Sequence, residues 1–370
     1  MATGSAFLLY DRQSTPRGDT QFGWTDWEML MADRPVAAGR LQLRAMTSVE
    51  ALSLGAHGYP LLLQTGGTDG NSVLHDRQHA QSLPMELAVA HEQPMGAILT
   101  SLYAGAVGEP ALGPAAYMHR ASAQHDPLAP IGHHWQDATH QSFGVATAGV
   151  SAHGVKLEGS AFNAREPGDD RLSFYYRGAR LDSYAGRLSW STTPQLSVSA
   201  WWGYLVADDR LDPISPMHRY GVSLTNERVG VAGGAWATTL VWGMNVHHHE
   251  GVSHALAHGD PNASPHHHAS SLLAETDLGL GTRDAVFGRI ERVMKSGEDL
   301  GFLGGDLTQL YDVRSVAAGY AHEMLAFGAG ALGIGARGAI DLLPETLRQT
   351  YGTRTPVGAA VYLQVRPRRQ

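Results

Sequence analysis

The sequence contains no cysteine among its 370 residues. This absence excludes disulfides, cysteine-ligated zinc sites, iron–sulfur clusters and c-type haem attachment. Charged residues make up only 17% of the chain, against about 25% in an ordinary soluble domain. The net charge is -8, which argues against a general nucleic-acid binder, so we expect no nucleic-acid partner.

Long hydrophobic runs are also missing. No stretch approaches the roughly 18 consecutive apolar residues that a transmembrane helix needs. The start, MATGSAFLLYDRQ, has no basic residues ahead of its short apolar run, so it does not resemble a signal peptide. We therefore expect that, if the protein is exported, its signal peptide is absent from this chain.

The sequence does contain an alternating pattern with a period of two, which predicts β-strands with one apolar face. In 195–206, the residues of one parity are Leu196, Val198, Ala200, Trp202, Tyr204 and Val206. The stretch 355–366 repeats the pattern with Val357, Ala359, Val361, Leu363 and Val365. Helical spacing is scarce, and the 44 glycines interrupt most of the chain.

About sixteen such segments follow one another, and short connections alternate with long ones. This alternation is typical of an outer-membrane barrel, which has tight turns at one end and long loops at the other. The predicted strands are 5–12, 22–32, 36–50, 84–92, 95–107, 138–152, 154–165, 179–192, 195–207, 217–229, 232–246, 270–281, 284–296, 311–324, 327–342 and 355–366.

We therefore predict an all-β fold in which 1–370 form a single antiparallel transmembrane barrel of about 16 strands. A closed barrel pairs every backbone N–H and C=O group inside hydrocarbon, and it needs only one apolar face per strand. Aromatic residues near the segment ends, such as Tyr10, Trp190 and Tyr320, fit interfacial girdles. A soluble all-β protein is the alternative, but no propeller-type repeat is present.

The chain resembles porin-type bacterial outer-membrane barrels over its whole length. Two segments, 75–79 (HDRQH) and 132–140 (GHHWQDATH), are also similar to a family of uncharacterised outer-membrane proteins. That resemblance implies a loose association with heavy-metal resistance and no established activity.

The connection 247–269 is rich in histidine and is expected to be an extracellular loop. Imidazole suits Cu(II), Zn(II) and Ni(II), and a mobile His-rich tract can chelate without a preformed cage. The alternative is a solvated polar loop with no metal. The candidate ligands are His247, His248, His249, His254, His258, His266, His267 and His268.

A second candidate site lies in and after the connection 108–137. A linker this long is expected to fold into the lumen or to form a lid over it. Its polar residues are candidate metal ligands, and the alternative is that they pin the loop to the barrel wall. The candidates are His119, His125, His133, His134, Asp137 and, just beyond, His140.

Charged residues of both signs fall on the parity expected to face the lumen. Mixed signs favour a polar lumen crossed by ion pairs over a single-sign selectivity ring. The expected pore-lining residues are Arg44, Lys156, Glu158, Arg187, Glu275, Asp277, Arg289, Glu291 and Arg366.

From these patterns we expect an outer-membrane pore for small solutes in a Gram-negative bacterium, linked through its histidines to transition-metal binding or transport. Expected partners are the lipid bilayer, lipopolysaccharide, small solutes or metal ions, and two further copies in a homotrimer. One alternative is a plugged structural or surface-interaction barrel. The other, less favoured, is an outer-membrane hydrolase, because no G-x-S-x-G or H-E-x-x-H motif occurs.

Overall fold

The structure is a computed structural model. It describes residues 1–69, 72–137, 141–165, 170–174, 180–206, 216–248, 266–302 and 309–367. Within these residues, no helix has the length and apolar character needed to cross a membrane.

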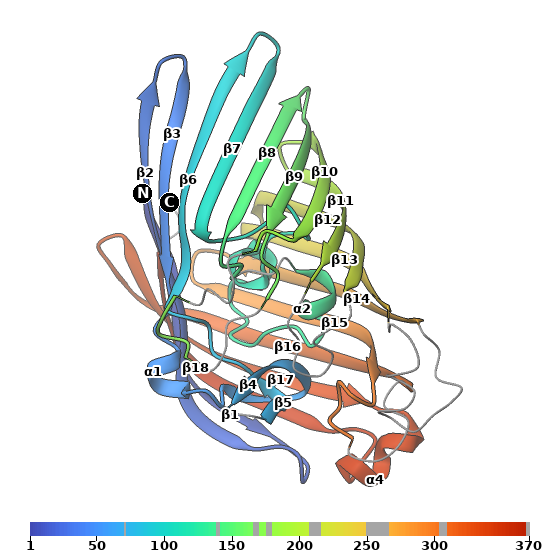
Figure 1. Cartoon of the computed structure of the whole chain (residues 1–370). Coiled ribbons are helices and arrows are strands. Elements are labelled where there is room, and N and C mark those ends of the chain that lie inside the picture. Colours follow the sequence, from blue (N-terminus) through green and yellow to red (C-terminus); the bar gives the residue numbers. More distant parts are fainter. Residues whose placement is uncertain are drawn as a thin grey trace.

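Sixteen antiparallel strands close into one barrel, as the sequence predicts. Each strand pairs with its neighbour in chain order, and β1 pairs with β18 to close the ring (Figure 1). The strands are β1 Ala2–Gln13, β2 Thr20–Val36, β3 Gly39–Thr47, β6 Pro84–Met95, β7 Ile98–Val107, β8 Val145–Ala152, β9 Val155–Phe162, β10 Ser183–Thr193, β11 Leu196–Leu205, β12 Met217–Val231, β13 Gly233–His248, β14 His266–Leu280, β15 Asp284–Ser296, β16 Leu310–Phe327, β17 Gly330–Leu342 and β18 Val357–Pro367.

The strands alternate between an apolar outer face and an inner face that lines the lumen. On β11, Trp201 is 5% exposed and faces inward, while its neighbour Trp202 is 40% exposed on the outside. On β18, Val361 and Val365 are exposed, whereas Tyr362 between them is buried. The outer surface is therefore a band of exposed aliphatic and aromatic side chains, the pattern that a barrel in hydrocarbon requires.

The two ends of the barrel differ in their connections. One end, here called the turn end, carries the short hairpins and both termini. At the turn between β8 and β9, His153 and Gly154 both have positive φ, as a two-residue hairpin requires. The other end, here called the loop end, carries the long connections, which include η3 Glu345–Leu347 and α4 Arg348–Tyr351.

Two long connections run into the barrel (Figure 1). Insertion A, residues 48–83, holds α1 Ala51–Leu54 and a separate hairpin of β4 Tyr59–Asp69 and β5 Ser72–Gln78. Insertion B, residues 108–144, holds η1 Tyr117–His119, η2 Ala121–Ala123 and α2 His133–Gln136. The hairpin is not predicted from the sequence, since no strand is expected between the predicted strands 36–50 and 84–92.

Candidate functional site: the lumen and its two insertions

An apolar core lies in the lumen where the two insertions meet the wall formed by β1, β14 to β16 and β18. Insertion A contributes Leu62 and Leu63, and insertion B contributes Leu128 and Trp135. All four are at most 3% exposed. They pack with side chains of the barrel wall and the loop-end connections, among them Leu9, Phe287, Val293, Leu300, Val313, Tyr351 and Tyr362.

Insertion B is fixed to the barrel wall by buried ion pairs. Nε of Arg120 lies 2.6 Å from Oε1 of Glu275 on β14, and its Nη1 lies 2.8 Å from Oδ1 of Asp137. All three side chains are at most 2% exposed. Ser122 also donates to Glu275 at 2.8 Å and exchanges a hydrogen bond with Thr239 on β13. Arg120 thus links Asp137, near the other end of insertion B, to Glu275 of the barrel wall.

A second group of ion pairs continues the attachment toward β15 and β17. Asp126 of insertion B lies 3.3 Å from Arg289 and 3.0 Å from Arg337. Next to it, Nδ1 of His125 lies 2.6 Å from Oδ2 of Asp277. Buried ion pairs lose hydration, and the loss is tolerated only with good geometry and additional hydrogen bonds. The network therefore holds insertion B in one position.

The hairpin of insertion A is attached in the same way at the loop end. Asp76 accepts hydrogen bonds from the backbone N–H of Leu63 at 2.7 Å and from the hydroxyl of Tyr351 at 3.1 Å, and it pairs with Arg17 at 2.5 Å. Burial raises the pKa of Asp76 although Arg17 opposes the shift. Contacts from three separate loop-end segments thus converge on one carboxylate.

Glu50 lies at the base of insertion A, beside insertion B. Its carboxylate accepts hydrogen bonds from the backbone N–H groups of Gln81 at 2.8 Å and Asp26 at 3.2 Å. Burial raises the pKa of Glu50 to about 8. At neutral pH the folded protein therefore favours its uncharged form.

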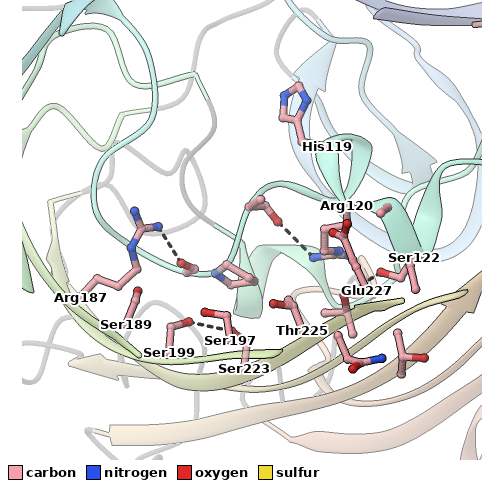
Figure 2. A pocket seen from close by; sticks show the side chains of 18 residues that line it. His119, Arg120, Ser122, Arg187, Ser189, Ser197, Ser199, Ser223, Thr225 and Glu227 are labelled. Atoms are coloured by element: carbon pink, nitrogen blue, oxygen red, sulfur yellow. Dashed lines mark hydrogen bonds between the residues drawn. The ribbon is translucent and has the colours of Figure 1, made fainter. Parts of the chain in front are cut away.

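On the turn-end side of insertion B, the described residues line three cavities. One, of about 390 Å³, is lined by β1, β2, β18 and the η1–η2 turns. A second, of about 240 Å³, lies over a floor of hydroxyl side chains on β10 to β13, including Ser199 and Ser223 (Figure 2). A third, of about 220 Å³, follows β3 and β6 to β10. The first two share His119 and Glu227, and the last two share Arg187, so we treat them as one vestibule.

The expected pore-lining residues divide into two groups. Five line the vestibule: Arg44, Lys156, Glu158, Arg187 and Arg366. Glu158 pairs there with Lys156 at 2.7 Å and with Arg187 at 2.9 Å. The other four are at most 3% exposed and lie against insertion B: Glu275, Asp277, Arg289 and Glu291. Glu291 accepts hydrogen bonds from the backbone N–H groups of Ile131 and Gly132.

The structure does not gather the expected ligands of insertion B around one point. His119 packs edge-on against Trp27 with ring centroids 4.4 Å apart. Nε2 of His133 lies 2.9 Å from the side-chain oxygen of Gln78. The rings of His133 and His134 are 4.0 Å apart. His125 and Asp137 are in the ion pairs described above, and His140 lies outside the described residues.

Among the residues that the structure describes, no group of three or more His, Asp or Glu side chains is placed to hold a metal ion. The physical reason in insertion B is that its polar side chains contact the wall and insertion A. Because His140 lies outside the described residues, the metal site of insertion B stays a prediction, as does the alternative that its polar side chains pin the loop to the wall.

The His-rich connection is described only at its two strand ends. The backbone register places His247 opposite His267 and His248 opposite His266, and His268 pairs with Val246. His249, His254 and His258 lie outside the described residues, so the prediction for the loop itself stays a prediction.

Sequence reasoning missed the residues that attach insertion B most strongly. Arg120 and Arg337 were not among the candidates, although both are at most 5% exposed. A usable signal was present, since Glu275, Asp277 and Glu291 fall on the lumen parity and need partners when buried. Those partners come from distant segments, which strand periodicity does not reveal.

No protein-family model matches the chain, and no curated protein matches it by sequence. Solved structures do match it over nearly its full length. OprB of Pseudomonas putida in its high-pH structure aligns with a TM-score of 0.56 at 9% identity, covering 99% of this chain and 93% of that one. OmpF of Salmonella typhi, solved as a complex with daunomycin, aligns with a TM-score of 0.54 at 10% identity, covering 98% and 97%.

A porin refined at 1.8 Å resolution aligns with a TM-score of 0.51 at 11% identity, covering 99% of both chains. This chain has the porin fold. Because all three identities are far below 25%, the likeness establishes the fold and leaves the activity to be argued from the chain's own residues.

Proposed function

We propose that this porin-fold chain is an outer-membrane pore for small polar solutes, and that insertion B narrows its passage. The closed barrel and its apolar outer band suit a bilayer, and bacterial outer membranes are where such barrels occur. The observation that carries the proposal is the polar vestibule, which adjoins insertion B inside a closed barrel.

The charges of the vestibule suggest which solutes would pass. The cavity along β3 and β6 to β10 is lined by four basic and four acidic side chains: Arg40, Arg44, Lys156, Arg187, Glu86, Glu92, Glu109 and Glu158. A single-sign ring would select ions of one charge, and this set has no such excess. Burial raises the pKa of Glu109 to about 7, so its charge changes near neutrality. We therefore propose weak selectivity for small neutral or zwitterionic solutes.

The pore is tested by reconstitution of the full chain in planar bilayers and in liposomes. We expect small unitary conductance steps, and liposome swelling in small sugars or amino acids that falls steeply with solute size. If neither conductance nor swelling is seen, the plugged-barrel alternative is favoured. The packed core between the insertions and the wall is also compatible with a plugged barrel.

Metal binding at the outer mouth is a second candidate, and the strand register favours it. The backbone register brings His247 and His267 to opposed positions at the end of a continuous β13–β14 ladder. Directly opposed residues of an antiparallel pair are close neighbours on the same face of the sheet. Histidines of the His-rich connection could chelate Cu(II), Zn(II) or Ni(II).

Calorimetric titration with each metal tests this site. Binding should be saturable at pH 7.5 and should weaken below about pH 6, because imidazoles protonate there. The variants His247→Asn and His267→Asn should weaken binding, whereas His57→Asn in insertion A, a control with an exposed side chain, should not. Equal affinity in all of them would remove the candidate.

A further inference from the structure

Three charged side chains lie on the outer face of β15 and β16, where most neighbours are apolar. Arg292, Asp312 and Arg314 share the outward parity of Ile290 and Val316, which are 59% and 38% exposed. The side chains of Arg292 and Arg314 are themselves 48% and 57% exposed. The adjacent lumen-facing charges are buried, so this cluster is separate from the ion network that holds insertion B.

The cluster has two cations and one anion. Asp312 accepts from Nε of Arg292 at 3.0 Å and from Nη2 of Arg314 at 3.1 Å, and the register places Arg292 directly opposite Arg314. One carboxylate is shared between two guanidinium groups, which leaves a net charge of one positive unit and guanidinium N–H groups without a carboxylate. A planar guanidinium matches the oxygens of a phosphate with two parallel hydrogen bonds.

The position along the strand sets the depth of the cluster. At the turn end of the same strands, Asp284 accepts hydrogen bonds from Tyr320 and His322 on β16, which marks a polar and aromatic boundary. Arg292 lies eight residues further along β15. At about 3.4 Å per residue and a tilt of about 40°, that is roughly 20 Å along the barrel axis, close to the apolar band of about 25 Å in such barrels. The two arginines therefore lie near the opposite edge of the band, on the loop-end side.

A positive charge on the lipid face is costly at the middle of the membrane and is much better tolerated near its edge. Two adjacent arginines with a single carboxylate remain partly uncompensated at that edge, unless the surrounding lipid supplies an anion. In the orientation that the proposed function implies, the loop end faces the outer leaflet. The anion at this depth would then be a lipid phosphate.

We propose that Arg292 and Arg314 form a binding site for the phosphate of a phosphorylated glycolipid of the outer leaflet. The proposal rests on the outer-membrane location in the proposed function but not on pore activity. Asp312 orients both guanidinium groups and limits their net charge. The site would hold one lipid against the wall formed by β15 and β16.

The test uses the full chain in nanodiscs of zwitterionic phospholipid doped with either phosphorylated lipid A or its dephosphorylated form. Native mass spectrometry counts retained lipid. We expect the wild type to retain the phosphorylated form, and Arg292→Gln with Arg314→Gln to weaken retention about thirtyfold, from about 1 kcal/mol per arginine. Asp312→Asn should strengthen it, because the net charge rises.

The matched control is Arg34→Gln with Arg228→Gln, which removes two exposed arginines near the turn end. Retention that is equal in the two double variants, or equal for the two lipid forms, would overturn the proposal. Displacement by millimolar inorganic phosphate would overturn it too, because the site would then take free phosphate. Conductance of the same variants in planar bilayers separates the outcomes, because lipid retention is expected even if no current flows.

Discussion

Arg120→Leu is the most informative single change in the lumen. The side chain is 2% exposed and joins Glu275 on the wall to Asp137 in insertion B. Removing one member of a buried ion pair costs about 3–5 kcal/mol, because the partner charges stay buried without compensation. Glu275 keeps Arg289, 3.3 Å away, so the main loss falls on Asp137 and on insertion B itself.

Such a loss should release insertion B without unfolding the barrel, whose strand ladder is untouched. The opening equilibrium of the segment would rise about a hundredfold to a few thousandfold. Hydrogen exchange of amides 117–137 should accelerate accordingly, while exchange in β14 stays slow. Unitary conductance in planar bilayers should increase, because the segment beside the vestibule is displaced.

The control is Arg348→Leu, an arginine with a side chain 65% exposed that pairs with Glu345 three residues away. Exposed pairs contribute about 0–1 kcal/mol, so exchange and conductance should both match the wild type. If Arg120→Leu behaves like this control, the ion network does not hold insertion B and the reasoning is refuted.

Three further predictions follow from the lumen. Burial raises the pKa of Glu50 to about 8. The contribution of Glu50 to stability is therefore full below its unfolded pKa and is lost as pH rises toward 8. Glu50→Gln should flatten this pH dependence in thermal unfolding, and an unchanged slope would refute the assignment. Leu62→Ala should lower the free energy of unfolding of insertion A in urea by about 2–5 kcal/mol. Leu52 is 62% exposed in the wild type, so Leu52→Ala should change it little. Similar losses in the two variants would contradict the buried hairpin. Glu158→Gln leaves Arg187 with less compensation, so the reversal potential in a salt gradient should shift toward anions, and a shift toward cations would contradict the vestibule.

The sixteen strands could be predicted because each has one face in the lumen and one on the outer surface. Because of that asymmetry, the sequence of a strand has a period of two, as in 355–366. The structure confirms which residues of this segment face outward. The predicted strands 138–152 and 154–165 leave a single residue between them, which fits the tight turn that the structure has at His153 and Gly154. The two-sided barrel thus encodes its own strands and most of its turns.

The insertions could not be predicted in the same way. The hairpin of insertion A is buried on both faces, so Leu61, Leu62 and Leu63 form an apolar run without alternation. Insertion B depends on partners up to 240 residues away, such as Gln364, which donates a hydrogen bond to the carbonyl oxygen of Gln124. Periodicity carries no information on such contacts. The histidines of insertion B therefore suggested a metal site, whereas their described contacts are with Trp27, Gln78 and Asp277.

The central claim is that this barrel conducts small solutes past insertion B. Single-channel recording of the purified wild type beside Arg120→Leu tests it most directly. We expect small, stable conductance steps in the wild type and larger steps in the variant. If neither protein conducts, although both are folded in the bilayer, the lumen is plugged and the pore is contradicted.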